Sequence, residues 1–337
     1  MVSLPPGAPG RVAVVGLGLI GGSLARLLHA RGVDVVATDV VPAARQAARR
    51  AGLAVADDVA ACVPDAALVV LAVPLRVMGV VAEQVAAAAP AHATVTDVGS
   101  VKGPVRDAVR AAGLGDRFVG AHPMSGTERS GFDASTADLL DDVVWAVTVD
   151  DPAAVDPDRL RQVLALVTGP LRGRATVVTD DVHDEAAALV SHVPHVLATQ
   201  LLNAVAGAPV RHVALRLAAG SFRDGTRVAF GDPARTAAMV GQNAGWVAPA
   251  LRKVVRDLEV LVAALETNGA THDFFHAADD VRATGRPVRA VRDGAAARTE
   301  RFALTGDWAA ALVERCTAGA VVVGVTPHGA DLEVPAG

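Results

Sequence analysis

Short apolar runs alternate with helical stretches along the first half of the chain. Between several of the runs lie Ala-, Arg- and Leu-rich stretches of helical length, such as 20–31 and 42–51. Near-continuous apolar strands that alternate with helices are typical of a parallel sheet covered on both faces. The pattern therefore predicts a doubly wound α/β domain over residues 11–178. Its predicted strands are 12–15, 33–38, 67–73, 94–97, 118–121, 143–149 and 175–178.

The pattern changes after Asp180, where long Ala/Leu/Val-rich stretches lack strand-like runs. It predicts one long helix over 181–206, which Pro194 should kink because its ring removes a backbone donor. A further helical stretch covers 210–219, and one or two helices cover 233–266. We therefore expect an all-α domain over residues 179–280.

The two ends of the chain have a different texture. Residues 1–10 are rich in Pro and Gly and lack a basic start and an apolar core, so they predict a flexible leader rather than a signal peptide. Residues 281–337 are richer in Arg, Gly and polar residues, with one strand-like run at 320–325. They form an extension to which the pattern assigns no role.

Composition narrows the class of protein. A chain of 337 residues favours two domains, and its net charge of −5 is spread without the clustered basic face of a nucleic-acid-binding protein. The longest apolar runs fall well short of the roughly 20 residues that a membrane-spanning helix needs. Two cysteines without a surrounding motif predict a reduced cytoplasmic protein with two inert thiols. The absence of tyrosine excludes dehydrogenases that use a Tyr–Lys pair as proton donor.

A glycine loop follows the first predicted strand. Gly16 permits a tight turn, Gly18 lets the backbone approach a pyrophosphate, and Gly21 lets the next helix pack on the strand. The helix then presents free amides and a positive dipole to phosphates. This context predicts a Rossmann-type dinucleotide site, whose lining we expect to include Leu19, Ile20 and Val73 as well.

Asp39 closes the second predicted strand, where a carboxylate binds a ribose 2′-hydroxyl. Because it would repel a 2′-phosphate, it favours NAD over NADP. Arg45 and Arg49 lie close enough in sequence to leave NADP open.

Three polar, glycine-containing segments interrupt the apolar pattern. Residues 97–103 and 120–131 each follow a predicted strand, and ligands of open α/β sheets bind at the carboxyl ends of strands. Ser100 and His122 could therefore converge beside a nicotinamide. The third segment, 220–227, breaks the helical pattern of the second domain.

At these segments the sequence resembles the prephenate/arogenate dehydrogenase family of tyrosine biosynthesis. The resemblance runs in order from Arg11 to Glu266, and the segment around His122 is its most diagnostic piece. The matching elements are the glycine loop, Asp-Val-Gly-Ser-Val-Lys (97–102), Gly-Ala-His-Pro-Met-Ser-Gly-Thr-Glu (120–128), Ser-His-Val-Pro-His (191–195) and Phe-Arg-Asp-Gly-Thr-Arg (222–227).

The resemblance implies NAD-dependent oxidative decarboxylation of prephenate to 4-hydroxyphenylpyruvate, CO2 and NADH. A neutral histidine is a natural proton acceptor near pH 7, and the resemblance gives this role to His122, with Ser100 hydrogen-bonding alongside. A helix N-cap before 101–110 explains Ser100 about as well. A structural histidine that caps a turn is the alternative for His122.

Substrate contacts also follow from the resemblance. It places Arg227 on the ring carboxylate, for which a bidentate guanidinium is suited, and His192 and His195 near the side chain. A core histidine is the alternative for His192. Thr127 and Glu128 match positions at the substrate pocket, with a surface ion pair as the alternative for Glu128, and Gly220 opens the segment that carries Arg227.

Two other interpretations concern single residues. His183, His192 and His195, together with Asp184 and Glu185, suggest a zinc site. No cysteine accompanies them, however, and hydride chemistry with NAD needs no metal, so we expect no metal. Lys102 could be mistaken for the catalytic lysine of hydroxyacid dehydrogenases, and its position after Gly-Ser predicts a solvated helix start instead.

Assembly and alternatives complete the prediction. Large apolar faces on the helical domain predict a homodimer, as in the family. The extension is too short and strand-poor for the regulatory ACT domain that many relatives append; it would pack on the helical domain or carry a small sheet. Arogenate dehydrogenase is the alternative within the family. A non-catalytic NAD sensor would not need Ser100, His122 and Arg227 together.

Overall fold

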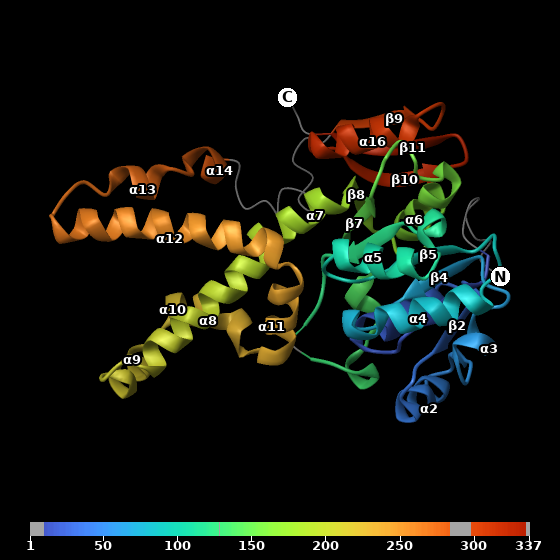
Figure 1. Ribbon diagram of the computed structural model, residues 1–337, viewed down its shortest axis with the longest axis horizontal. Coiled ribbons are helices and arrows are strands. Elements are labelled where there is room, and N and C mark those ends of the chain that lie inside the picture. Colours follow the sequence, from blue (N-terminus) through green and yellow to red (C-terminus); the bar gives the residue numbers. More distant parts are fainter. Residues whose placement is uncertain (1–9, 128, 284–297, 335–337) are drawn as a thin grey trace. The chain divides into compact units, whose positions relative to one another are not determined.

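The computed structural model describes residues 10–127, 129–283 and 298–334, which form two compact units (Figure 1). The first, here called the sheet unit, contains the described residues up to Asp184, the short segment Phe230–Asp232 and Thr299–Val334. The second, the helical unit, contains Glu185–Ala229 and the described residues from Pro233 to Arg298. The predicted leader lies outside the described residues, except for Gly10.

The first sheet of the sheet unit is parallel throughout, as the apolar pattern predicted. Its order is β3-β2-β1-β4-β5, and β1 is central, with Val12 opposite Val35 on one side and Leu68 on the other. The strands are β1 (Val12–Val15), β2 (Val35–Thr38), β3 (Ala54–Val55), β4 (Leu68–Leu71) and β5 (Thr94–Asp97). The associated helices are α1 (Leu19–Ala30), α2 (Pro42–Arg50), α3 (Val59–Cys62), α4 (Leu75–Ala88) and α5 (Gly103–Ala111).

A second, mixed sheet holds the remaining strands in the order β6-β7-β8-β10-β11-β9. Strand β6 (Gly120–Pro123) follows the short turn η1 (Gly115–Arg117) and runs antiparallel to β7 (Val144–Val149), which is parallel to β8 (Arg174–Thr179) across helix α6 (Pro157–Thr168). The described residues between β6 and β7 form the short turns η2 (Phe132–Ala134) and η3 (Ala137–Leu140) and contain no crossover helix of the kind that parallel strands need. One parallel bridge, Val95 to Phe118, joins the two sheets and brings the start of β6 beside β5.

The C-terminal extension completes this second sheet. It contains β9 (Arg298–Ala303), α16 (Trp308–Thr317), β10 (Val321–Thr326) and β11 (Gly329–Val334), and β10 pairs with β8. The expectation of a strand-poor extension was wrong. Strands β9 and β11 could not be recognised from the sequence, because they mix charged with apolar residues and so lack a continuous apolar run. The extension belongs to the sheet unit, and Leu312 and Leu332 are buried in its core.

The helical unit begins within the stretch predicted as one helix. Helix α7 (Asp180–Ala187) continues through a π-helical turn, η4 (Ala188–His192), into α8 (Val193–Ala206). The irregularity lies just before Pro194, which sits in the first turn of α8. The other elements are α9 (Arg211–Leu217), α10 (Gly220–Thr226), η5 (Arg227–Phe230), α11 (Pro233–Gln242), α12 (Ala244–Glu266), α13 (His272–His276) and α14 (Asp279–Ala283).

Two findings bear on the expectations from composition. Among the described residues, no helix is both long and apolar enough to cross a membrane. Cys62 and Cys316 are free and buried, and burial raises the pKa of the Cys62 thiol to about 12 and that of Cys316 above its ordinary value. Since the thiolate is the reactive form, burial lowers the reactivity of both thiols in the folded protein.

Candidate active site

The glycine loop has the geometry that a dinucleotide requires. Gly16 has a φ of +106°, and a Cβ there would lie 2.3 Å from the Ala72 carbonyl oxygen, so only glycine fits. A Cβ on Gly21 would lie 2.0 Å from the Gly16 carbonyl oxygen, whereas a Cβ on Gly18 would meet nothing within 4 Å. Gly16 and Gly21 therefore shape the turn, and Gly18 leaves open space at the start of α1.

Asp39 lies beside this loop. Its carboxylate accepts hydrogen bonds from the Leu17 amide (2.6 Å) and the Val41 amide (2.8 Å), which ties the end of β2 to the loop. Arg45 donates to the backbone carbonyls of Asp39 and Val40, and Arg49 pairs with Asp57 at 2.7 Å. Arg45 and Arg49, which kept NADP possible as the cofactor, are thus both bound to other groups of the chain. The side chain that contacts the glycine loop is the acidic Asp39.

The remaining predicted cofactor residues surround the same turn. Leu19 and Ile20 form the first turn of α1, whose N-cap is Gly18 and has no side-chain cap. The first amides of α1 are thus available to phosphate oxygens. Val73 follows β4, and its Cγ1 atom would lie 3.0 Å from a Cβ on Gly16. These residues fit a dinucleotide bound across the carboxyl ends of β1 and β4.

Lys102 departs from the prediction of a solvated helix start. Its side chain is fully buried, and its ammonium group donates to Asp97 Oδ2 at 2.5 Å and to the Ala121 carbonyl at 2.7 Å. Asp97 Oδ1 in turn accepts from the Ala121 amide at 3.1 Å. The pair therefore fixes β6 against β5 immediately before His122. No sequence signal marks a lysine for burial, because the partner that neutralises it becomes its neighbour only in the fold.

His122 is half-buried on β6 and bonded to a residue from another element. Its Nδ1 lies 3.0 Å from Nε2 of His183, and Nδ1 of His183 lies 2.8 Å from Oδ1 of Asp184. Asp184 also accepts from the backbone amides of Lys102 (2.7 Å) and Gly103 (2.8 Å) at the start of α5. His122, His183, Asp184 and the first residues of α5 thus form one connected network.

The pKa values of the two buried carboxyl groups of α7, Asp180 and Asp184, are shifted in opposite directions. Burial alone would raise the pKa of Asp184, but the hydrogen bonds from His183, Gly103 and Lys102 outweigh it and hold the pKa below its ordinary value. Burial dominates at Asp180 and raises its pKa, despite the nearby cations Lys102 and Arg106. Asp184 is therefore ionised at neutral pH.

The other predicted residues of the sheet unit occupy loops. Ser100 is half-buried before α5, whose N-cap is Lys102 and whose first amides are held by Asp184. The alternative of Ser100 as the N-cap is therefore wrong. Thr127 is exposed after β6, and its hydroxyl accepts from the Arg129 amide at 3.3 Å. Glu128 lies outside the described residues.

The predicted residues of the helical unit divide into a buried and an accessible set. His192 is buried, and its Nδ1 lies 3.0 Å from the Asn243 side-chain nitrogen, which fits the alternative of a core histidine. His195 is half-buried on α8, and its Nδ1 donates to the Ser191 carbonyl at 2.8 Å. Arg227 is exposed directly after α10, whose first residue is Gly220. His183 has no ring nitrogen available for the suggested zinc site, because both of its ring nitrogens are hydrogen-bonded to protein groups.

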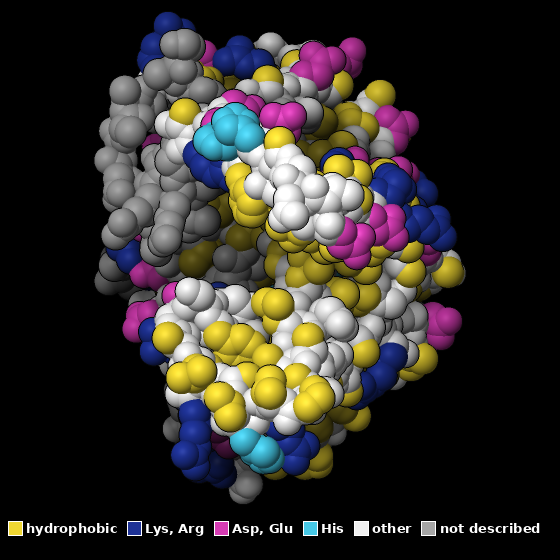
Figure 2. Space-filling view, turned by 90° about the vertical axis from the view of Figure 1, so that its left-hand side faces the viewer, with side chains coloured by type: hydrophobic (Ala, Val, Ile, Leu, Met, Phe, Trp, Pro, Cys, Tyr) yellow, Lys and Arg dark blue, Asp and Glu magenta, His cyan; other side chains and the backbone are white. Residues whose placement is uncertain are grey.

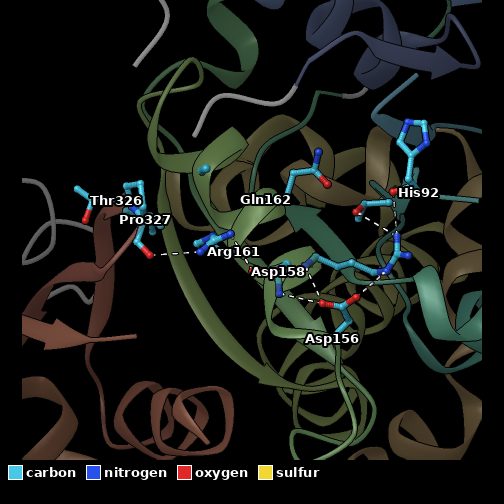
Figure 3. A pocket seen from close by; sticks show the side chains of 11 residues that line it. His92, Asp156, Asp158, Arg161, Gln162, Thr326 and Pro327 are labelled. Carbon is cyan, nitrogen blue, oxygen red and sulfur yellow. Dashed lines mark hydrogen bonds and ion pairs between the residues drawn. The ribbon is translucent and has the colours of Figure 1, made fainter. Parts of the chain in front are cut away.

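A cavity of about 420 Å³ lies at the opposite edge of the sheet (Figure 3). His92 and Thr94 line it at the amino end of β5, whereas Asp97 and Ser100 lie at or beyond its carboxyl end. Arg161 pairs with Asp158 at 2.8 Å and donates to the Pro327 carbonyl. Because ligands of such sheets bind at the carboxyl ends of strands, this cavity is not the candidate active site.

The parallel sheet, the glycine loop with Asp39 and the histidine network define a dinucleotide-dependent oxidoreductase with a helical second domain. Comparisons specify the family. Residues 24–177 match the prephenate dehydrogenase nucleotide-binding domain, and residues 179–278 match the prephenate dehydrogenase dimerization domain. The chain belongs to the prephenate dehydrogenase family.

Relatives and solved structures agree with this assignment. The cyclohexadienyl dehydrogenase of Zymomonas mobilis is 35% identical over 79% of this chain and 92% of its own. A Corynebacterium glutamicum structure assigned to prephenate dehydrogenase is 32% identical, with a TM-score of 0.79 over 91% of this chain and 97% of its own.

Two more distant structures carry names that bear on substrate and cofactor. Aquifex aeolicus prephenate dehydrogenase, solved with hydroxyphenyl propionate and NAD+, is 27% identical, with a TM-score of 0.72 over 82% of this chain and 96% of its own. Synechocystis arogenate dehydrogenase is 26% identical, with a TM-score of 0.72 over 81% and 99%.

Proposed function

We propose that the protein is an NAD-dependent prephenate dehydrogenase that converts prephenate to 4-hydroxyphenylpyruvate and CO2. The observation that carries this proposal is the hydrogen-bonded His122, which lies near the carboxyl end of β6 in the unit that also holds the glycine loop. A dinucleotide site and a histidine base are the two components that oxidation of an alcohol requires. NAD, when bound, supplies the acceptor for the hydride that leaves C4 of the substrate.

The sheet unit holds the cofactor. Gly16, Gly18 and Gly21 with the uncapped start of α1 receive the pyrophosphate, and Leu19, Ile20 and Val73 line the turn. The Asp39 carboxylate accepts from the ribose 2′-hydroxyl and excludes a 2′-phosphate, which makes NAD the preferred cofactor.

His122 accepts the proton of the C4 hydroxyl as the hydride leaves, and Ser100 hydrogen-bonds the same oxygen. When the ring carboxylate departs as CO2, its bonding electrons complete the aromatic ring and leave a phenolate oxygen. The His122 imidazolium returns the proton to that oxygen, so the reaction releases no net proton. Aromatisation supplies much of the driving force, and the protein contributes mainly orientation and proton transfer.

The two substrate carboxylates require donors. Arg227, exposed after α10, suits the ring carboxylate because its guanidinium binds carboxylates through two parallel hydrogen bonds. Strong ground-state binding of that carboxylate would oppose CO2 loss, so Arg227 contributes binding and alignment rather than rate. His195 serves the pyruvyl side chain, with Thr127, Glu128 and Gly220 at the pocket; the buried His192 supports α8 rather than contacting the substrate directly.

Arogenate, which carries an amine in place of the side-chain ketone, is the second candidate substrate. The similarity to Synechocystis arogenate dehydrogenase favours testing it. His195 donates Nδ1–H to Ser191, which leaves Nε2 as the ring nitrogen available to a ligand and permits either substrate. We favour prephenate because the more similar structure and the Aquifex aeolicus enzyme both bear that name.

The proposed assembly is a homodimer in the cytoplasm. The match of residues 179–278 to a dimerization domain supports the dimer, and two free, buried cysteines support a reducing compartment. Exposed hydrophobic side chains gather over the lobe of the helical unit that α8 and α9 form (Figure 2).

The test is NADH formation at 340 nm with prephenate and with arogenate, each supplied with NAD and NADP. We expect turnover with prephenate and NAD, a kcat about 10²- to 10⁴-fold lower for His122→Asn, and mainly a raised KM for prephenate in Arg227→Ala. Wild-type turnover by His122→Asn, or a loss confined to kcat in Arg227→Ala, would contradict the respective role. Exclusive use of arogenate would replace the proposed substrate.

A further inference from the structure

The hydrogen bonds around His122 determine which of its ring nitrogens carries the proton. Ionised Asp184 has only acceptor atoms, so Nδ1 of His183 must be the donor in their 2.8 Å hydrogen bond. In a neutral ring the other nitrogen, Nε2, is then an acceptor. The 3.0 Å contact with His122 is consequently a hydrogen bond that Nδ1–H of His122 donates. Nε2 of His122 is the unprotonated nitrogen, which is the form that a base requires.

We propose that His183 and Asp184 are positioning residues that hold His122 in this tautomer and orientation for proton transfer. The inference rests on the proposed role of His122 and adds two residues to it. Neither His183 nor Asp184 needs to touch the substrate; they act through His122.

Asp184 is itself rigidly placed, which makes it suitable for this task. Its two oxygens accept from the backbone amides of Lys102 and Gly103, and its side chain is 5% exposed. The ammonium group of the same Lys102 holds the Ala121 carbonyl, next to His122 in β6. Lys102 thus binds Asp184 through its main-chain amide and β6 through its side chain. Both His183, through Asp184, and His122, through β6, are therefore held by the residue that precedes α5.

The network also provides a place for the positive charge that forms during the reaction. When Nε2 of His122 takes the substrate proton, Nδ1–H can pass to Nε2 of His183. The imidazolium of His183 then forms an ion pair with Asp184, and the proton returns by the same path when the phenolate oxygen accepts it. Proton count and charge balance at each step, and no other reactant is needed.

Other charged groups near the pair are already compensated. Asp97 and Lys102 neutralise each other behind β6, and Asp180 lies 3.8 Å from Arg106. Arg106 also pairs with Asp107 and Asp150. Asp184 is the carboxylate that is hydrogen-bonded to His183.

The experiment compares two substitutions of His183 in the full-length enzyme. His183→Leu removes the acceptor for Nδ1–H, and we expect kcat to fall about 10- to 100-fold while the KM values for prephenate and NAD stay within about twofold. His183→Gln offers an amide oxygen in place of the ring nitrogen and is expected to recover part of that loss. Both variants should move the acid limb of the kcat/KM profile to lower pH, because the Asp184 charge no longer stabilises protonated His122.

A double variant separates positioning from a general structural effect. Because His183 acts through His122, His122→Asn combined with His183→Leu should be no slower than His122→Asn alone. Asp180→Asn is the matched control, since it removes a buried carboxyl from the same helix and is expected to leave kcat and the pH profile unchanged. NAD affinity, measured by tryptophan fluorescence, checks that each variant folds. If His183→Leu does not fold, the kcat and pH profile of His183→Gln test the positioning role.

The outcomes distinguish this inference from the function on which it rests. Wild-type turnover by His122→Asn would reject the role of His122 itself. A slow His122→Asn together with a wild-type kcat and pH profile in the His183 variants would overturn only the positioning role. Losses that add in the double variant would likewise overturn it.

Discussion

The sheet unit and the helical unit bury their apolar residues to very different degrees. In the sheet unit, whole strands such as β1 and β4 are buried, and the extension adds Leu312, Val322 and Leu332 to the same core. In the described part of the helical unit, the buried apolar cluster consists of Ala188, Val193 and Val247. A strand inside a covered sheet is buried on both faces, whereas these helices cover one another only where they cross.

Helix α12 shows the difference within one element. Its apolar positions recur at alternating intervals of four and three residues, which places them on a single helical face. That face is buried at Val247, half-buried at Leu251 and Val254, and exposed by 44% at Leu258 and 60% at Leu265. The stripe therefore continues beyond the part that the described residues cover, which is the pattern expected of an interface with a second copy.

The largest effect is expected when charges are placed on the exposed part of the apolar stripe of α12. Leu258→Asp with Leu265→Asp should dissociate the proposed dimer, since burial of each leucine is worth about 1.5–3 kcal/mol and a two-fold interface contains each position twice. The loss is on the order of 6 kcal/mol, or roughly a 10⁴-fold increase in the dissociation constant. Light scattering and sedimentation at micromolar concentration measure the mass.

Arg256→Asp is the matched control, because it introduces the same residue on the opposite face of α12. It should leave the mass unchanged. A wild-type protein that is monomeric at micromolar concentration, or a double variant that stays dimeric, would show that the stripe is not the interface.

The sheet unit should respond instead to loss of core volume in the extension. Leu312→Ala removes a fully buried side chain of α16, and we expect a loss of about 2–5 kcal/mol in the free energy of unfolding without a change of mass. Glu314→Ala, an exposed neighbour on the same helix, should change stability by less than about 0.5 kcal/mol. Urea unfolding measures both, and equal midpoints would mean that the extension does not share the core.

The smallest expected effect is the electrostatic contribution of Asp184. Asp184→Asn removes the charge and replaces one of the two acceptor oxygens by an NH2 donor, so one of the two backbone amides loses its acceptor. We expect this to cost about 1–2 kcal/mol at neutral pH. Since the folded pKa lies below the ordinary value of 3.8, this stability is fully present above that pH and is lost as the pH falls through the folded value. The two proteins should therefore converge in urea stability as the pH falls below the folded pKa of Asp184, and a difference that stays constant with pH would contradict the assignment.

Much of the fold followed from local patterns. The predicted bounds of β1 and β5 agree with the structure. Strand β1 is an uninterrupted apolar run, and β5 is marked by the β-branched residues Thr94, Val95 and Thr96, which favour strands. Strands β9 and β11 escaped prediction, since their charged residues pair within the fold, as Arg301 does with Asp331. The antiparallel pairing of β6 with β7 was also not predicted, because apolar periodicity carries no information on strand direction.

The candidate site divides in the same way. The glycine loop, Asp39 and His122 could be identified from the sequence, because backbone geometry and phosphate chemistry restrict those positions to particular residues. The sequence marks His183 and Asp184 only as possible metal ligands, and it predicts a solvated Lys102.

By itself, the sequence determined the apolar strands, the glycine turn and the histidine to which we assign proton transfer, since each depends on a residue's own chemistry and its near neighbours. Only the tertiary structure decided that Lys102 is buried against Asp97, that Asp184 replaces Ser100 at the start of α5, and that His183 orients His122. The physical reason is that charge compensation and hydrogen bonding act over about 3 Å, and the partners involved lie up to 82 positions apart in the chain.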